Sequence, residues 1–157
     1  MVKIENQKFD IRIDKNGFWY YQKSKINRIS LIKLFSSILH FKEDGQYWLI
    51  TSKEQGTIEV EDAPFVINKI EFNGSGENLS CWVTTNIEDR YLIGEKNNLN
   101  VIFDTNDIPR PYVWLDRGLK ALVLRNVFYE LVEKSILNKD GWYGIWSDGI
   151  FFRLGKE

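Results

Sequence analysis

Arginine and aromatic side chains alternate along one short stretch of the sequence. Arg110, Tyr112 and Trp114 are spaced two residues apart, so they share one face of a strand if Val113 and Leu115 face the core. A guanidinium beside aromatic rings suits a planar or sugar-phosphate ligand, because it allows stacking and cation–π contact. The alternative is that Tyr112 and Trp114 pack against a neighbouring part of the protein.

A helix is predicted just after this stretch, over residues 118–137, where apolar residues recur at helical spacing. Arg117 and Gly118 enter this helix, and the N-terminal amides of a helix carry partial positive charge that suits an anion. Arg125 falls inside the apolar arc of the same helix. A guanidinium in that position must reach solvent or find a partner.

Together these residues predict a ligand site for a small anionic molecule, held between two lobes. Its members are Arg110, Tyr112, Trp114, Arg117, Gly118 and Arg125. The alternative for Arg125 is a structural ion pair, with Asp62 or Asp116 as the partner.

The other reactive residue types give little support for catalysis. His40 lies on the polar arc of a helix predicted over residues 30–41, where no nucleophile and orienting group are expected. Cys81 alternates with Leu79 and Val83, which predicts a buried and unreactive thiol. We therefore expect no catalytic residue, no metal site and no cofactor.

Three carboxylates lie near one predicted strand end, at Glu59, Glu61 and Asp62. Paired carboxylates are the catalytic groups of many hydrolases. Carboxylates on a strand are far more often simply solvated, so a carboxylate-based hydrolase is a minor alternative.

The composition excludes several classes of protein. The 157 residues include 21 Lys and Arg against 22 Asp and Glu, a formal charge of −1, which disfavours nucleic acid as a partner. The apolar runs are far shorter than the roughly 20 residues of a membrane span, and residues 1–6 do not resemble a signal peptide. A single cysteine excludes an intramolecular disulfide. We expect a cytoplasmic protein with no membrane partner.

The elements that must position the candidate site are mostly short strands. Asn-Gly and Asp-Gly pairs divide the chain into stretches rich in β-branched and aromatic residues, as is typical of antiparallel hairpins. Two amphipathic helices interrupt this series of strands. One is predicted over 30–41, with Ser30 as N-cap, and the other over 118–137. Each is followed by an Asp-Gly turn, at Asp44 and Asp140, which are 96 residues apart. We predict an α+β fold of two similar lobes with an internal repeat, each an antiparallel curved sheet with one packed helix, divided at residues 1–61 and 62–157.

Six segments in this order resemble one bacterial family, the domain-of-unknown-function 1285 family. They are residues 9–14, 31–35, 58–65, 110–113, 118–122 and 125–131, and the resemblance covers nearly the whole chain. It implies two lobes with repeated β and α motifs, and it suggests a signalling or ligand-responsive role. It supplies no catalytic residues.

These observations favour a non-catalytic ligand-binding or signalling module for a small anionic molecule. The main alternative is a protein-interaction or scaffolding domain, whose partner is another protein or a second copy of the chain in a homo-oligomer.

Overall fold

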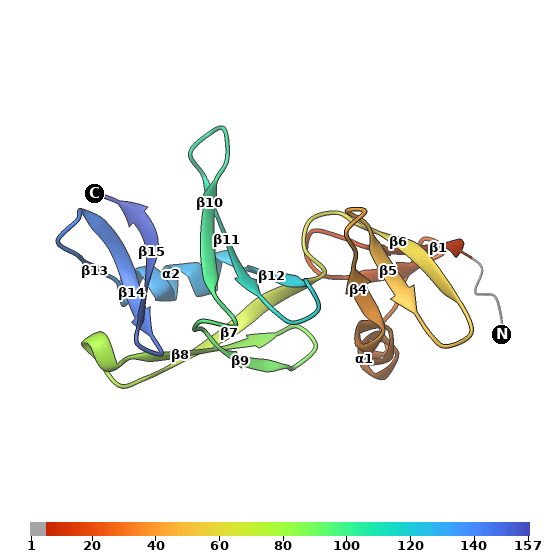
Figure 1. Ribbon diagram of the computed structural model, residues 1–157, viewed down its shortest axis with the longest axis horizontal. Helices are drawn as coiled ribbons and strands as arrows, with labels where there is room; N and C mark the ends of the chain where they lie inside the picture. The colour runs from red at the N-terminus through yellow and green to blue at the C-terminus, as the bar shows by residue number, and fades with distance from the viewer. Residues whose placement is uncertain (1–5) are drawn as a thin grey trace. The chain divides into compact units, whose positions relative to one another are not determined.

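The computed structural model describes residues 6–157, which form two compact units (Figure 1). Unit 1 runs to Pro64 and also includes the loop Arg117–Leu119. Unit 2 comprises Phe65–Asp116 and Lys120–Glu157. Each unit combines strands with one α-helix, so the predicted α+β class with two similar lobes is confirmed. The units divide three residues later than predicted, and a short loop from the second half of the sequence belongs to unit 1.

Unit 1 is a six-stranded sheet with one helix. In chain order its elements are β1 (Asn6–Ile13), β2 (Trp19–Tyr21), β3 (Ser24–Lys25), α1 (Ile29–Ser37), β4 (Leu39–Phe41), β5 (Tyr47–Ile50) and β6 (Gln55–Val60). The strand order is β3-β2-β1-β6-β5-β4. Strands β1 and β6 are parallel, with Arg12 opposite Glu59, and the other neighbours are antiparallel.

Unit 2 contains a second six-stranded sheet, a helix and a third, three-stranded sheet. Its elements are β7 (Phe65–Asn73), the 3-10 helix η1 (Gly76–Asn78), β8 (Ser80–Thr85), β9 (Arg90–Leu92), β10 (Leu99–Phe103), β11 (Pro109–Trp114), β12 (Lys120–Val123), α2 (Arg125–Glu133), β13 (Ile136–Leu137), β14 (Trp142–Ser147) and β15 (Ile150–Lys156). The six-stranded order is β10-β11-β12-β7-β8-β9, with β12 and β7 parallel, and β13-β14-β15 form the third sheet.

The internal repeat is visible in the sheet topology. Each six-stranded sheet consists of two three-stranded meanders, joined by a parallel pair between the first strand of one and the last strand of the other. The segment around the Asp-Gly turn at Asp44, α1-β4-β5-β6, is matched around Asp140 by α2-β13-β14-β15. The repeats also differ: β4-β5-β6 complete the first six-stranded sheet, whereas β13-β14-β15 form a sheet of their own and β10-β11-β12 complete the second (Figure 1).

Alternating residues fill the core of unit 1. Ile11 and Ile13 of β1 are buried, whereas Arg12 between them is exposed, as period-two alternation requires. Helix α1 covers the apolar side of the sheet, and the ring of Phe35 stacks on the fully buried Trp19 with centroids 6.0 Å apart.

In unit 2, a buried polar contact holds the third sheet against the second. The Oγ of Ser147 in β14 accepts a hydrogen bond from the Cys81 amide of β8 at 2.9 Å. The same hydroxyl donates to the carbonyl of Ile93 at 2.6 Å. Ser147 is completely buried, and this hydroxyl satisfies a backbone donor and a backbone acceptor.

Both helices are shorter than the sequence predicts. Helix α1 begins after Arg28 without a side-chain cap, so Ser30 is not the N-cap, and it ends at Ser37. Residues predicted as its last turn form β4, because Leu39 turns inward and the strand pairs with β5. Residues 120–123, predicted as helix, form β12 between β11 and β7, since pairing on both edges outweighs helix propensity.

Candidate functional site

Two of the predicted arginines line one groove. Arg110 of β11 and Arg125 of α2 border a concavity of about 360 Å³ in unit 2. The remaining lining residues are largely apolar: Ile108, Pro109, Pro111, Leu122, Val123, Leu124, Phe128 and Tyr129. All of them belong to unit 2, whereas the sequence predicted a site shared by two lobes.

Arg110 and Tyr112 lie two residues apart on the same face of β11. Val113 is completely buried on the core side, and Trp114 next to it is 36% exposed. The Nε of Arg110 donates a hydrogen bond to the hydroxyl of Tyr112 at 3.1 Å, which directs the guanidinium along the strand. The Tyr112 hydroxyl therefore helps to position the Arg110 side chain.

Arg125 is the first residue of α2, where its side chain is exposed. The sequence placed it in an apolar arc, but that arc assumed a helix starting at Gly118. In the shorter helix the buried positions are Val127 and Leu131. No carboxylate of residues 6–157 pairs with Arg125, so the predicted ion pair with Asp62 or Asp116 is not formed.

The start of α2 adds backbone donors to the same groove. Its N-cap is Leu124, which lines the groove and has no side chain able to cap the helix. The first amides of a helix have no intrahelical acceptor and carry partial positive charge. Two guanidiniums and this helix terminus give the groove a positive end, while Phe128 and the 57% exposed Tyr129 give it an aromatic wall.

Arg117 and Gly118 do not belong to the groove. Both lie in the loop that is part of unit 1, and neither starts a helix. The Nη1 of Arg117 donates to the carbonyl oxygens of Ser36, Ser37 and Leu39, at 3.0, 3.0 and 2.9 Å. Ser36 and Ser37 lie in the last turn of α1, where carbonyl groups lack intrahelical donors, and Leu39 begins β4. Arg117 therefore caps α1.

Tyr112 and Trp114 lie beside the groove but do not line it. Tyr112 is only 5% exposed. The ammonium of Lys120 in β12 lies 4.5 Å from the centre of its ring and 5.8 Å from that of Trp114. The cation on these rings is thus a lysine that sequence reasoning missed. Lys120 could have been found from the pairing of Trp114 with Lys120 in adjacent strands. The sequence did not indicate this pairing, because residue 120 falls within the helix expected over 118–137.

The remaining candidates have local structural roles. His40 lies on β4 opposite Trp48, not on a helix, and burial together with Arg117 and Lys42 lowers its pKa. Cys81 is completely buried, and burial raises the pKa of its thiol to about 11. Glu59 pairs with Lys8 at 3.7 Å, and Glu61 accepts a hydrogen bond from the Lys15 amide at 2.9 Å.

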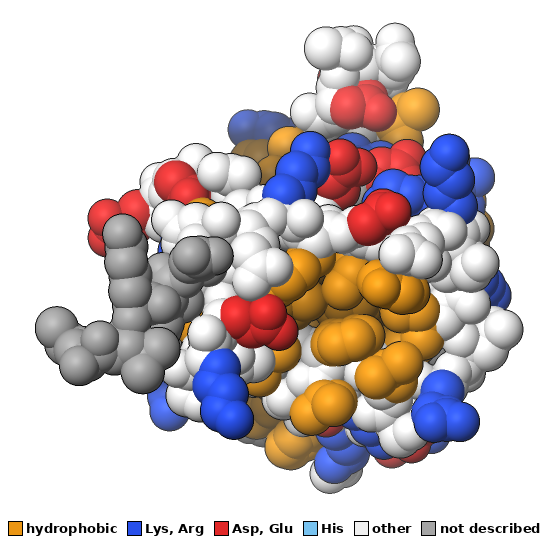
Figure 2. Space-filling view, turned by 90° about the vertical axis from the view of Figure 1, so that its right-hand side faces the viewer, with side chains coloured by type: hydrophobic (Ala, Val, Ile, Leu, Met, Phe, Trp, Pro, Cys, Tyr) orange, Lys and Arg blue, Asp and Glu red, His pale blue; other side chains and the backbone are white. Residues whose placement is uncertain are grey.

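A second concave surface, in unit 1, has a different chemistry. Figure 2 shows a group of apolar side chains exposed on one face of the molecule. A groove of about 370 Å³ there lies between α1 and the sheet and is lined by Phe9, Ile11, Leu34, Phe35, Ile38 and Leu49, with Thr51 and Glu54. Leu34 is 59% exposed. This lining contains no cation and does not suit an anion.

Family models account for nearly the whole chain. One, the DUF1285 N-terminal domain of unknown function, matches residues 4–63, and the other, the C-terminal domain of the protein of unknown function DUF1285, matches residues 64–154. The chain belongs to the DUF1285 family. The family's two domains meet between Ala63 and Pro64, one residue before the two units divide.

Solved structures of DUF1285 proteins agree with this assignment. A DUF1285 family protein from Silicibacter pomeroyi DSS-3 is 38% identical, with a TM-score of 0.90 over 99% of this chain and 85% of that one. One from Shewanella baltica OS155 is 28% identical, with a TM-score of 0.61 over 80% of this chain and 91% of that one. No curated protein matches the sequence. Neither helix within residues 6–157 has the length and apolarity needed to cross a bilayer.

Proposed function

We propose that this DUF1285 chain is a non-catalytic module that binds a small organic anion in the groove of unit 2. The observation that carries the proposal is that Arg110 and Arg125 line one groove whose other walls are mostly apolar. A carboxylate or similar group binds at the two guanidiniums and the start of α2. The apolar body of the ligand lies against Pro111, Leu122 and Phe128.

The exposure of Arg125 sets the strength of binding. Hydrogen bonds to charged groups contribute about 1.5–3 kcal/mol each when water is displaced, and less when it is not. The groove is open, so we expect dissociation constants on the order of micromolar to millimolar. Reversible binding in this range suits a module that senses a metabolite, which agrees with a signalling role.

A thermal-shift screen tests this proposal. Benzoate and hexanoate are the anionic probes, with benzyl alcohol and hexanol as neutral counterparts. A ligand at 100 times its dissociation constant stabilises the native state by about 2.7 kcal/mol. For a chain of this size the midpoint rises by roughly 5–10 °C. The variants Arg110→Gln and Arg125→Gln should lose the shift, and Arg28→Gln, an exposed arginine outside the groove, should keep it.

Two results would overturn the proposal. One is no shift with any anion across the panel. The other is an equal shift with the neutral counterparts, since the arginines would then contribute nothing.

The apolar groove of unit 1 favours a second candidate function, self-association of the chain. Exposed apolar surface of this kind is characteristic of protein contacts (Figure 2). A second copy of the chain is the simplest partner. Light scattering after size-exclusion chromatography should then give a mass well above 18.6 kDa, and Leu34→Glu should return it to the monomer value. A monomer mass at high protein concentration would contradict this role.

A further inference from the structure

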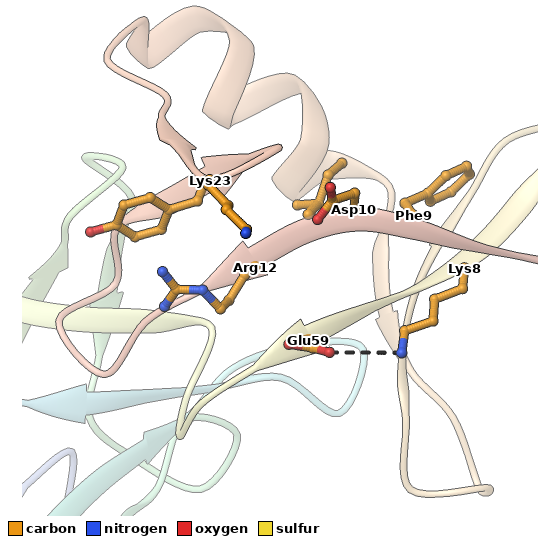
Figure 3. Close-up of a pocket in the computed structure, with 8 residues that line it drawn as sticks. Lys8, Phe9, Asp10, Arg12, Lys23 and Glu59 are labelled. Carbon is orange, nitrogen blue, oxygen red and sulfur yellow. Dashed lines mark ion pairs between the residues drawn. The ribbon is translucent and has the colours of Figure 1, made fainter.

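We propose a second anion site in unit 1, specific for the phosphate group of a hydroxylated phosphomonoester and centred on Arg12 and Lys23. It lies in a hollow of about 400 Å³ beside β1 (Figure 3). Its lining residues come from β1, β2, the β2–β3 turn and β6: Lys8, Phe9, Asp10, Ile11, Arg12, Tyr20, Lys23 and Glu59. None of them lines the groove of unit 2, and this inference does not depend on the function proposed for that groove.

The charges in the hollow are unevenly compensated. Lys8 pairs with Glu59, with Nζ and Oε1 3.7 Å apart (Figure 3). Arg12 and Lys23 have no carboxylate oxygen of residues 6–157 within 4.0 Å, although Asp10 and Glu59 line the same hollow. Two cations therefore border one space without an ionic partner among residues 6–157.

Arg12 is held in place by an aromatic ring. Its guanidinium carbon lies 4.3 Å from the centre of the Tyr20 ring, which is directly opposite Arg12 on β2. The hydroxyl of Tyr20 donates to Oδ2 of Asp14 at 3.0 Å, and this bond fixes the ring. A guanidinium lying on an aromatic ring keeps its nitrogen donors available at its edge.

Lys23 occupies a strained backbone position. The β2–β3 hairpin has a two-residue loop, Gln22-Lys23, in which φ is +48° and +69°. Such loops favour Asn-Gly or Asp-Gly, because any residue with a Cβ is disfavoured at positive φ. Another two-residue hairpin loop, between β14 and β15, is Asp148-Gly149, which follows this rule.

This comparison indicates why a lysine stands in the turn. A glycine at position 23 would relieve the strain but would remove the ammonium that lines the hollow. In Figure 3 the Lys23 side chain extends from its turn toward the strand that carries Arg12. Strained backbone positions cluster at functional sites, and the function we assign to Lys23 is to present a cation.

A phosphate monoester matches these groups. It carries between one and a half and two negative charges at neutral pH and three acceptor oxygens, whereas a carboxylate carries one charge. Arg12 supplies a planar pair of donors, and Lys23 supplies a point charge. The carboxylates of Asp10 and Glu59 then accept hydrogen bonds from hydroxyl groups on the rest of the ligand. The site thus favours a sugar-phosphate type of ligand.

Isothermal titration with glucose 6-phosphate, inorganic phosphate and glucose tests the site. Glucose 6-phosphate should bind most tightly, inorganic phosphate more weakly, and glucose not measurably. Lys23→Gln and Arg12→Gln should each weaken binding by about tenfold or more, the loss expected for one charge-assisted contact. Lys53→Gln is the matched control, because Lys53 is an exposed lysine of unit 1 outside the hollow.

A double variant separates strain from binding. Gln22→Asn with Lys23→Gly should raise the thermal midpoint of unfolding, because it relaxes the turn, while it weakens glucose 6-phosphate binding by about tenfold or more. Absence of binding to the unmodified chain, or equal binding by Lys23→Gln and the unmodified chain, would overturn the proposal. Arg110→Gln with Arg125→Gln should leave this binding unchanged, so the two sites are tested separately.

Discussion

The Nη1 of Arg117 donates a hydrogen bond to the carbonyl oxygen of Leu39 at 2.9 Å, across 78 residues of sequence. The same nitrogen also donates hydrogen bonds to the carbonyl oxygens of Ser36 and Ser37 at the end of α1. A residue that the sequence placed in a ligand site is instead part of the architecture of unit 1. This leaves Arg110 and Arg125 as the arginines of the groove in unit 2.

Removing the Arg117 side chain should therefore destabilise the protein without affecting ligand binding. Arg117→Ala loses three charge-assisted contacts at a partly exposed site, so we expect a loss of about 2 kcal/mol in the free energy of unfolding. The midpoint of thermal unfolding should fall by roughly 4–8 °C. Arg117→Lys should recover part of this loss. An Ala variant as stable as the unmodified chain would show that the cap contributes nothing.

The buried hydroxyl of Ser147 provides a second test of the fold. Ser147→Ala leaves the Cys81 amide and the Ile93 carbonyl without their partner in the interior of unit 2. An unsatisfied buried group costs about 1–3 kcal/mol, so urea unfolding should give a loss within or above that range. Ser37→Ala, whose hydroxyl bonds to Leu34 on the exposed side of α1, should cost within about 0.5 kcal/mol. Equal losses in the two variants would contradict the role of Ser147.

The lowered pKa of His40 predicts a pH dependence of stability. Burial, Arg117 and Lys42 disfavour the imidazolium in the folded chain, so the unfolded chain binds the proton more readily. The neutral His40 makes its full contribution to the free energy of unfolding above its unfolded pKa of about 6.5. This contribution is lost as the pH falls through the lower pKa of the folded chain. Between pH 7.5 and pH 5, the free energy of unfolding measured with urea should fall less for His40→Gln than for the unmodified chain. Identical losses would show that His40 does not contribute.

Local sequence patterns predicted much of the fold. The Asp-Gly pairs at Asp44 and Asp140 mark turns, and Val113 and Cys81 are buried as alternation indicated. These features depend on neighbours in the chain, where φ preference and period-two alternation act directly. The repeated topology followed from the similarity of the two turn regions.

The same local patterns gave wrong predictions where strands pair with partners far away in the sequence. Residues 120–123 are apolar at a spacing that fits a helix, yet they pair with β7, which lies more than 50 residues earlier in the sequence. Because the helix start was misplaced by seven positions, Gly118 against Arg125, the side-chain directions around it were wrong as well. This is why the position of Arg125 and the contact of Lys120 with Tyr112 were missed.

The groove between Arg110 and Arg125 is tested most directly by nuclear magnetic resonance of the amide groups during titration with benzoate. We expect saturable shift changes at Arg110 and over residues 124–129, and their loss in the variant that combines Arg110→Gln with Arg125→Gln. The absence of saturable changes at these positions, or the same changes in the double variant, would contradict it.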